Sequence, residues 1–214
     1  MTRREQAKDQ KRDRICAAAE YIIRREGIEK LTMRRLAEQA GVSLRTPYNL
    51  LGSKTDVLIA LLEGAELDPA LALNARHDQL IIEQLLGALD QVEAFFASDE
   101  DFYRAVYGSI MASNHHDVRD SRIEQVVAAC RKLVSQAAAH GELRRDTNAE
   151  QLGRYLAIQL VAVLGMWGAG FVTIRECIRQ VRGTWAGILL NHCSDSSRST
   201  LGLVYQATLL IDRD

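Results

Sequence analysis

The chain has 214 residues, of which 47% are apolar and 26% are charged, and its formal net charge is −1. This length suffices for one large domain or two small ones, and the apolar share can fill a sizeable core. Two prolines and the lack of strand-like alternation favour an all-α chain. The four cysteines form no CxxC pair, so their spacing indicates neither a zinc site nor a redox motif.

Charge is distributed unevenly along the chain. Residues 1–54 hold 13 Lys and Arg against 7 Asp and Glu, whereas the remaining residues hold 14 against 21. A basic N-terminal module on an acidic body is typical of a DNA reader carried by a domain that avoids DNA.

The first residues predict a basic arm and one amphipathic helix. Residues 1–12 are polar and mostly basic, and we expect a frayed arm that is either solvated or in contact with a DNA groove or phosphates. Apolar residues at helical spacing predict a helix over 13–26, which Gly27 ends.

Residues 32–54, TMRRLAEQAGVSLRTPYNLLGSK, predict two short helices joined by a tight turn. Thr32 is a suitable N-cap, and Gly41 can adopt positive φ where the first helix ends. A helix, a turn with a glycine and a second helix form the DNA-reading helix-turn-helix.

The second of these helices has two possible starts. If Ser43 caps it, Pro47 falls at the fourth helical position and removes a backbone hydrogen bond. If Thr46 caps it, Pro47 takes the first helical position, where the missing N–H is harmless. Both starts give a short helix, and the sequence leaves both open.

This stretch resembles the TetR/AcrR family of bacterial transcriptional regulators over about residues 10–62. The matching residues are Thr32, Leu36, Ala37, Ala40, Gly41, Val42, Ser43, Thr46, Tyr48, Gly52, Ser53 and Lys54. The resemblance implies an N-terminal helix-turn-helix domain over 1–54 and a linking helix over 54–65. It also implies a C-terminal helical bundle for ligand binding and dimerisation over 66–214.

Nine residues are candidates for DNA contact. They lie in the first turn of the first helix-turn-helix element, in the second element, and at the start of the linking helix: Thr32, Met33, Arg34, Leu44, Arg45, Thr46, Tyr48, Asn49 and Lys54. Arg45 can form a bidentate pair with guanine, and Asn49 can pair with adenine. The resemblance implies that Thr46, Tyr48 and Lys54 contact phosphates; the alternatives are a packed aromatic for Tyr48 and a solvated charge for Lys54.

Apolar spacing and caps predict six further helices, over 78–97, 100–113, 118–140, 148–168, 172–193 and 198–212. The polar residues 194–199 are expected to form a linker. We predict that the helices over 148–168 and 172–193 form the four-helix interface of a homodimer, an arrangement that the resemblance also implies. The candidate interface residues are Leu156, Leu160, Val163, Leu164, Ile178, Trp185, Ile188 and Leu189.

An aromatic cluster is the candidate ligand site. Phe102, Tyr103, Tyr107 and Met111, together with Met166 and Trp167, could line a cavity for an apolar or aromatic small molecule. The alternative is that these side chains are ordinary bundle core. Adjacent histidines at 115 and 116 point apart on a helix, so we expect no metal site.

No motif in the sequence indicates catalysis, because GxSxG, HExxH and a glycine-rich nucleotide loop are all missing. We therefore expect no enzyme activity and no cofactor. Glycines and Gln159 interrupt the uncharged stretch between Arg154 and Arg175, which favours a buried helix over a membrane span. Reduced, packed cysteines and the charged N-terminus favour the cytoplasm.

Together these observations predict a sequence-specific transcriptional regulator that binds a palindromic operator in double-stranded DNA as a homodimer. We expect a repressor that a small ligand releases. The alternative is a helical DNA-binding regulator without an effector, which acts constitutively or through a protein partner.

Overall fold

The computed structural model describes residues 3–63, 80–113 and 116–209, and this part of the chain is helical throughout. The predicted all-α fold is confirmed: the described residues form ten α-helices and one short 3₁₀ helix, with a single isolated bridge between Leu143 and Cys193 and no strand. The helices are α1 (Arg3–Glu26), η1 (Ile28–Lys30), α2 (Met33–Ala40), α3 (Arg45–Leu50), α4 (Lys54–Glu63), α5 (Ile81–Ala97), α6 (Glu100–Met111), α7 (His116–Ala139), α8 (Ala149–Gly168), α9 (Ile174–Leu190) and α10 (Asp195–Leu209).

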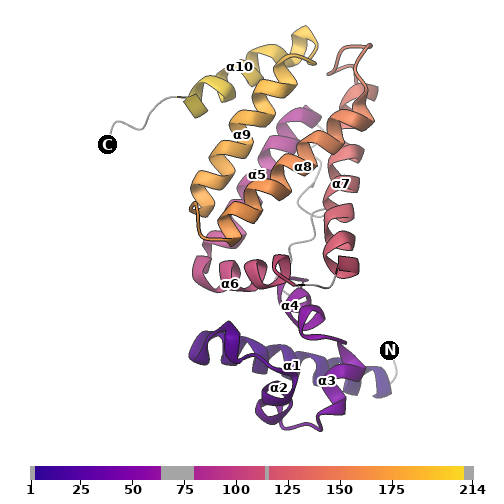
Figure 1. Cartoon of the computed structure of the whole chain (residues 1–214). Coiled ribbons are helices and arrows are strands. Elements are labelled where there is room, and N and C mark those ends of the chain that lie inside the picture. The colour runs from indigo at the N-terminus through magenta and orange to yellow at the C-terminus, as the bar shows by residue number, and fades with distance from the viewer. Residues whose placement is uncertain (1–2, 64–79, 114–115, 210–214) are drawn as a thin grey trace. The chain divides into compact units, whose positions relative to one another are not determined.

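The chain divides into two compact units (Figure 1). Unit 1 comprises Met1–Leu67 and Asp101–Arg119, and unit 2 comprises Asp68–Glu100 and Asp120–Asp214. The division falls inside α6, whose first residue belongs to unit 2. Residues 64–65 of the predicted linking helix, the predicted domain start at 66, and His115 lie outside the described residues.

In unit 1, α1 is longer than the predicted helix over 13–26. It begins at Arg3 and so includes most of the basic arm predicted over residues 1–12. Residues 5–14 are exposed, so burial of an apolar face does not account for the helix over this stretch. Its Arg, Lys, Gln, Glu and Ala residues all have high helix propensity, which the prediction underweighted. From Ile15 onward the apolar face packs, and Ile15, Ala19 and Ile22 are fully buried.

Local capping fixes the short helices that follow α1. The Thr32 hydroxyl accepts a hydrogen bond from the Arg35 backbone N–H at 3.1 Å, as the sequence predicts for the start of α2. Gly41 ends α2 in the left-handed region at φ 63°, which glycine adopts without strain. These two residues set the length of α2 and the direction of the turn that follows it.

The start of α4 is held by a reciprocal pair of side chains. Ser53 donates its backbone N–H and its hydroxyl to Asp56 Oδ2 at 2.6 and 2.7 Å, and Asp56 N–H donates back to Ser53 Oγ at 3.3 Å. Gly52 precedes them at φ 109°, where an added Cβ would lie 2.5 Å from Asp56 Oδ2. Glycine is therefore required for this cap to close.

In unit 2, α9 packs against α5, α8 and α10 (Figure 1). The core contains many aliphatic side chains and two tryptophans, Trp167 and Trp185, which are 0% and 2% exposed. The Trp185 indole N–H donates to the Leu156 carbonyl at 3.1 Å, so the only polar atom of this large side chain is satisfied inside the bundle.

A buried glutamate organises one end of the bundle. Glu142 lies in the turn after α7 and is 4% exposed, and its carboxylate accepts from the backbone N–H groups of Ile81 and Ile82 at 2.8 and 2.9 Å. These N–H groups open α5, so Glu142 satisfies donors that have no partner within the helix. Its carbonyl accepts from Ser194 N–H at 2.9 Å, which ties the same turn to the start of α10.

α10 begins earlier than predicted, because the expected linker over 194–199 lies mostly within its first turns. Ser197 is 1% exposed and donates its hydroxyl to the Glu142 carbonyl at 3.5 Å, so this residue faces the bundle and not the solvent. Polar composition alone suggested a linker, but capping and tertiary contacts make these residues helical.

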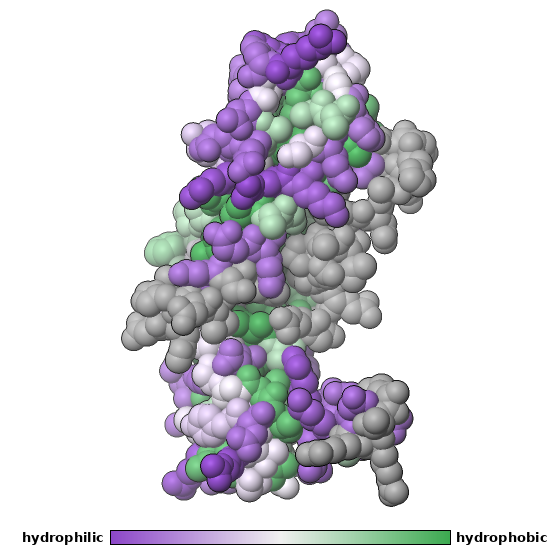
Figure 2. Space-filling model, turned by 90° about the vertical axis from the view of Figure 1, so that its right-hand side faces the viewer, coloured by the Kyte–Doolittle hydropathy of each residue, from purple (hydrophilic) through white to green (hydrophobic). Residues whose placement is uncertain are grey.

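The surface is mixed in character. Figure 2 shows one side of the molecule, where hydrophilic and apolar residues interleave in both units. Among the helices that the structure describes, none is long and apolar enough to cross a membrane.

Candidate DNA-binding and ligand-binding sites

The recognition helix α3 begins at Arg45, which differs from both predicted starts. Leu44 already has helical dihedral angles, and Thr46 N–H donates to the Ser43 carbonyl at 2.9 Å in a tight 3₁₀ turn. Pro47 therefore stands at the third helical position, where its missing N–H would have no partner within the helix. The Thr46 hydroxyl is not a cap, because it pairs with Ser43 Oγ at 2.9 Å.

The outer face of α3 is accessible and the inner face is packed. Leu44 and Tyr48 are 51% and 52% exposed, and Arg45 and Asn49 are also exposed. Pro47 is buried on the opposite side, which anchors the helix to the module. This arrangement leaves a cation, an amide and a phenol on one helix face, the side-chain types that contact base edges and phosphates.

Three predicted DNA contacts, Thr32, Met33 and Arg34, lie at the start of α2 and differ in exposure and in their partners, and they stay predictions. Met33 is only 8% exposed, because it lies on the same face of α2 as Leu36, Ala37 and Ala40, and its side chain belongs to the core. The Thr32 hydroxyl is engaged as the cap of α2. Arg34 lies on the outer face with a side chain that is 84% exposed, and it pairs with Glu38.

Lys54 has a partner within unit 1. Its ammonium group donates to the Ile28 carbonyl at 3.2 Å, and the side chain is half-buried. This contact links the start of α4 to η1. Lys54 is therefore not a fully solvated charge, and a phosphate contact would be made in addition to the one with Ile28.

Two polar contacts fix α2 relative to α1. Arg14 Nη2 donates to the Ala40 carbonyl at 2.7 Å, which satisfies an acceptor at the end of α2. Arg35 holds Glu26 through two hydrogen bonds of 2.5 and 3.2 Å, and this pairing lowers the pKa of Glu26. The position of α2 therefore depends on the middle and on the last turn of α1.

The six predicted ligand-binding residues fall in different units. Phe102, Tyr103, Tyr107 and Met111 belong to unit 1, whereas Met166 and Trp167 belong to unit 2. Phe102 and Tyr107 are each 8% exposed, and Phe102 and Tyr103 form an edge-to-face pair with centroids 5.2 Å apart. Trp167 is fully buried against Phe96, with centroids 4.6 Å apart, whereas Met166 is 45% exposed.

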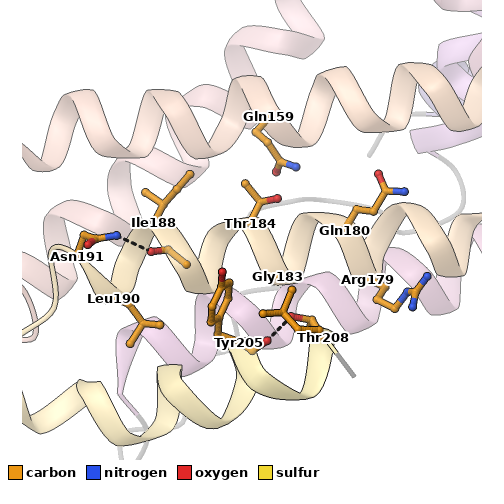
Figure 3. Close-up of a pocket in the computed structure, with 12 residues that line it drawn as sticks. Gln159, Arg179, Gln180, Gly183, Thr184, Ile188, Leu190, Asn191, Tyr205 and Thr208 are labelled. Atoms are coloured by element: carbon orange, nitrogen blue, oxygen red, sulfur yellow. Dashed lines mark hydrogen bonds between the residues drawn. The ribbon is translucent and has the colours of Figure 1, made fainter. Parts of the chain in front are cut away.

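A groove of about 830 Å³ lies elsewhere, between α8, α9 and α10 (Figure 3). Gln159 of α8 and Thr184 and Ile188 of α9 face it, and Tyr205 of α10 forms part of its wall. Gln159 Oε1 is buried without a hydrogen-bond partner, which marks an unsatisfied acceptor within this groove. None of the six predicted ligand residues lines the groove, and sequence spacing gave no indication of it.

Two glycines of α9 let α10 approach closely. A Cβ at Gly183 would lie 2.8 Å from Thr208 Oγ1, and one at Gly187 would lie 3.0 Å from the Tyr205 ring. Because glycine has no side chain, α10 can pack closely against α9 at these positions. α10 in turn forms one side of the groove.

Most of the residues predicted for a dimer interface lie in the core of a single chain. Leu156, Leu160, Leu164, Ile178, Trp185 and Leu189 are at most 7% exposed, because they pack between helices of the same bundle; only Val163 and Ile188 are half-buried. The exposed apolar face of α8 is instead formed by Tyr155, Ile158 and Met166, at 55%, 48% and 45% exposure. Helical periodicity identified apolar faces correctly but could not tell which neighbour covers them.

The cysteines are free thiols. Burial raises the pKa of Cys130 and of Cys177 to about 12, so both are neutral at physiological pH. Such thiols are poor nucleophiles, as expected for packed structural cysteines.

The N-terminal module matches a known protein family. Residues 15–61 match the model of bacterial regulatory proteins, tetR family. A comparison with curated protein sequences gave no match.

Solved structures share the fold over nearly the whole chain. FadR of Thermus thermophilus, a TetR-family transcriptional repressor in complex with lauroyl-CoA, has a TM-score of 0.60 at 19% identity and covers 95% of this chain and 97% of its own. SmeT, the repressor of the Stenotrophomonas maltophilia multidrug efflux pump SmeDEF, has a TM-score of 0.66 at 17% identity, with coverage of 86% and 91%. NalD of Pseudomonas aeruginosa has a TM-score of 0.63 at 14% identity, with coverage of 87% and 99%.

The exposed α3 face on a capped helix-turn-helix, followed by a helical bundle, defines a helix-turn-helix transcriptional regulator. The match over residues 15–61 identifies the N-terminal module as a tetR-family helix-turn-helix domain.

Proposed function

We propose that the protein is a repressor that binds a palindromic operator as a homodimer and is released by a small apolar or aromatic molecule. The observation that carries this proposal is the α3 face, on which Arg45, Tyr48 and Asn49 are exposed while Pro47 anchors the helix. In the major groove Arg45 would read guanine, Asn49 would read adenine, and Tyr48 would contact a phosphate. Arg34 and Leu44 complete the proposed surface.

The DNA test is selection of duplexes from a random pool, followed by affinity measurements on the selected sequence. Arg45→Ala should cost about 1–3 kcal/mol and relax preference at one base pair. Lys54→Ala should weaken binding to all duplexes alike, because the Lys54 ammonium group would contact the phosphate backbone of DNA and the Ile28 carbonyl, and not a base edge. An unchanged sequence preference in Arg45→Ala would remove Arg45 from the base-reading set.

The proposed dimer uses the exposed face of α8. Between Arg154 and Arg175 this segment carries no charge, and Tyr155, Ile158 and Met166 lie on its outer side. A two-fold contact brings each patch against its own copy, so an uncharged patch avoids repulsion between like charges. The unpaired Gln159 oxygen could then accept a hydrogen bond from the partner. Half-sites would be about 34–36 Å apart, or a multiple of that spacing.

Sedimentation at micromolar concentration tests the dimer. Ile158→Glu should produce monomers, because it places two like charges at the contact, whereas Leu203→Glu on exposed α10 should leave the dimer intact. A monomeric wild-type protein would remove dimerisation from the proposal.

The effector part of the proposal rests on fold and on aromatic residues. FadR was solved with lauroyl-CoA and SmeT with triclosan, which supports small-molecule binding by this fold. Lauroyl-CoA and triclosan are therefore suitable first probes in a gel-shift assay on the selected duplex. Release of DNA by either supports the proposal, and Tyr107→Ala should then reduce the response more than it reduces affinity for DNA. DNA binding that no metabolite pool alters would favour the regulator without an effector.

A further inference from the structure

We propose that the groove between α8, α9 and α10 is a binding site for a small amphipathic carboxylate that carries an N–H or O–H donor between its acid group and an apolar end. All residues that line the groove belong to unit 2. The site is separate from the effector site proposed around Tyr107, and the inference depends neither on DNA binding nor on that effector.

A buried acceptor in the groove calls for a donor from a ligand. Gln159 Oε1 is buried and has no hydrogen-bond partner in the part of the chain that the structure describes. The Thr208 hydroxyl, on the α10 wall, donates instead to the Tyr205 carbonyl at 2.8 Å. Asn191 Nδ2 donates to the Gly187 carbonyl at 2.9 Å (Figure 3). An amide oxygen that loses water without gaining a partner costs free energy, and a ligand N–H or O–H at this position recovers that cost.

The charge of the lining favours an anionic ligand. Arg179 is exposed at one end of the groove, and no aspartate or glutamate is among the described residues that line it (Figure 3). Arg179 also lowers the pKa of Glu176, but the Glu176 carboxylate is held at the start of α9, where it accepts from the Thr173 N–H and hydroxyl at 2.8 and 2.9 Å. A guanidinium can form a bidentate pair with a ligand carboxylate, whereas a cationic ligand would meet a like charge.

The other end of the groove is apolar. Ile188 and Leu190 lie there, and Gln159 lies between this end and Arg179 (Figure 3). From the rise per residue of a helix, Arg179 and Ile188 are about 13 Å apart along the α9 axis. The order of groups along the groove is therefore a cation, a buried acceptor and an apolar surface. A ligand with the complementary order contacts all three.

The size of the groove suits such a molecule. Its volume of about 830 Å³ lies within the range of small-molecule sites. Gln159 from α8 and Tyr205 from α10 point toward it from opposite sides (Figure 3). A ligand that contacts both walls should stabilise the packing of α10 against the bundle, and amide exchange in α10 should then become slower.

Hippurate (N-benzoylglycine) is the probe, because it has a carboxylate, an amide N–H and a phenyl ring in this order. Two analogues each remove one feature. In (benzoyloxy)acetate an oxygen atom replaces the N–H, and in hippuramide a neutral amide replaces the carboxylate. An NMR titration of the isotope-labelled full chain with millimolar hippurate should shift the amide resonances of Gly183 and Gly187. Each analogue should bind about tenfold more weakly than hippurate.

Two variants test which residue recognises which group. Gln159→Leu keeps the approximate size of the side chain without the acceptor, and should bind hippurate and (benzoyloxy)acetate with equal affinity. Arg179→Gln should bind hippurate and hippuramide with equal affinity, whereas Arg179→Lys, which keeps a cation, should retain the preference for hippurate. Arg175→Gln is the matched control, because it removes a charge of α9 that does not line the groove, and its affinities should equal those of the wild type.

Several results would overturn the proposal. They are unshifted Gly183 and Gly187 resonances, equal affinity of the wild type for hippurate and its ester analogue, and a Gln159→Leu variant that still discriminates between the two. Shifts confined to the amides of 102–111 would place hippurate at the proposed effector site instead. Because no DNA is present in the titration, a protein that binds no duplex leaves this result unaffected.

A second copy of the chain is the competing occupant, since a partner could also donate to Gln159. Ile158→Glu, designed to give monomers, distinguishes the two. Binding of hippurate by both the wild type and Ile158→Glu supports the small-molecule site. Binding by Ile158→Glu alone would show that a partner chain covers the groove in the wild type, and would overturn it.

Discussion

The two units present their exposed faces by different means. In unit 1, short helices are positioned by polar contacts, such as Thr32 to the Arg35 N–H, Arg14 to the Ala40 carbonyl and Ser53 to Asp56. In unit 2, long helices are held by aliphatic and tryptophan packing. The outer face of unit 1 at α3 is polar and cationic, whereas that of unit 2 at α8 is apolar and uncharged from Tyr155 onward.

This difference follows from helix length. A six-residue helix such as α3 is not stable alone, so its conformation must come from its neighbours. Polar caps and ion pairs supply fixed directions without covering the face that meets DNA. A 20-residue helix such as α8 gains its stability from the buried side, which leaves the other side available for a protein partner.

The largest expected effect breaks the packing of unit 2. Leu156 is fully buried between helices, so Leu156→Ala should lower the free energy of unfolding by about 2–5 kcal/mol. Gln151→Ala on the exposed side of the same helix is the control, with little change. Urea unfolding measures both, and an equal loss in the two variants would show that α8 does not derive its stability from its inner face.

A smaller effect tests how closely α7 and α8 approach. A Cβ at Gly153 would lie 2.6 Å from the Arg131 Cα, so backbone must move, and Gly153→Ala should destabilise by about 1–3 kcal/mol. Gly165→Ala, where no atom lies within 4 Å, should be neutral or stabilising through its helix propensity. Thermal unfolding of the two variants should therefore shift in opposite directions or differ clearly in size.

The helices of both units were largely predictable because their causes are local. Apolar spacing located α5 to α9, and single residues such as Thr32 and Gly41 set helix ends where expected. The first turns of α1 and α10 were missed for opposite reasons. Residues 5–14 have high propensity but no apolar face, and the start of α10 depends on a contact between Ser197 and Glu142, 55 positions apart.

The candidate sites were less predictable, because exposure depends on tertiary neighbours. The helix-turn-helix pattern identified Arg45, Tyr48 and Asn49, but it could not show that Met33 faces the core. The partner of Lys54 is a carbonyl 26 residues away, and no sequence spacing encodes that contact. Likewise, the groove beside α10 requires glycines at 183 and 187 to meet side chains from another helix.

The cap of α2 offers a test of the polar contacts in unit 1. Thr32→Ala leaves the Arg35 N–H without its acceptor and should destabilise unit 1 by about 0.5–2 kcal/mol. Thr32→Ser keeps the hydroxyl and should restore most of that loss. Hydrogen exchange at amides in the first turn of α2 separates this local effect from changes in the stability of unit 2. Equal protection in Thr32→Ala and wild type would make the cap dispensable.

The smallest expected effect is a dependence on acid that both units share. Hydrogen bonds from Arg35 hold the pKa of Glu26 below its ordinary value of 4.5. The backbone N–H and hydroxyl of Thr173 likewise lower the pKa of Glu176.

A carboxylate whose pKa is lowered on folding stabilises the protein above its unfolded pKa, and that contribution is lost as the pH falls through the folded pKa. Stability should therefore be insensitive to these groups from pH 7 down to about 5, and should decline below pH 4.5. Glu26→Gln should reduce the loss of amide protection in α1 and α2 on acidification, and Glu176→Gln should reduce it in α9. Hydrogen exchange at pH 7 and pH 3.5 measures this protection. A decline of unchanged slope in both variants would assign the acid sensitivity to other carboxylates.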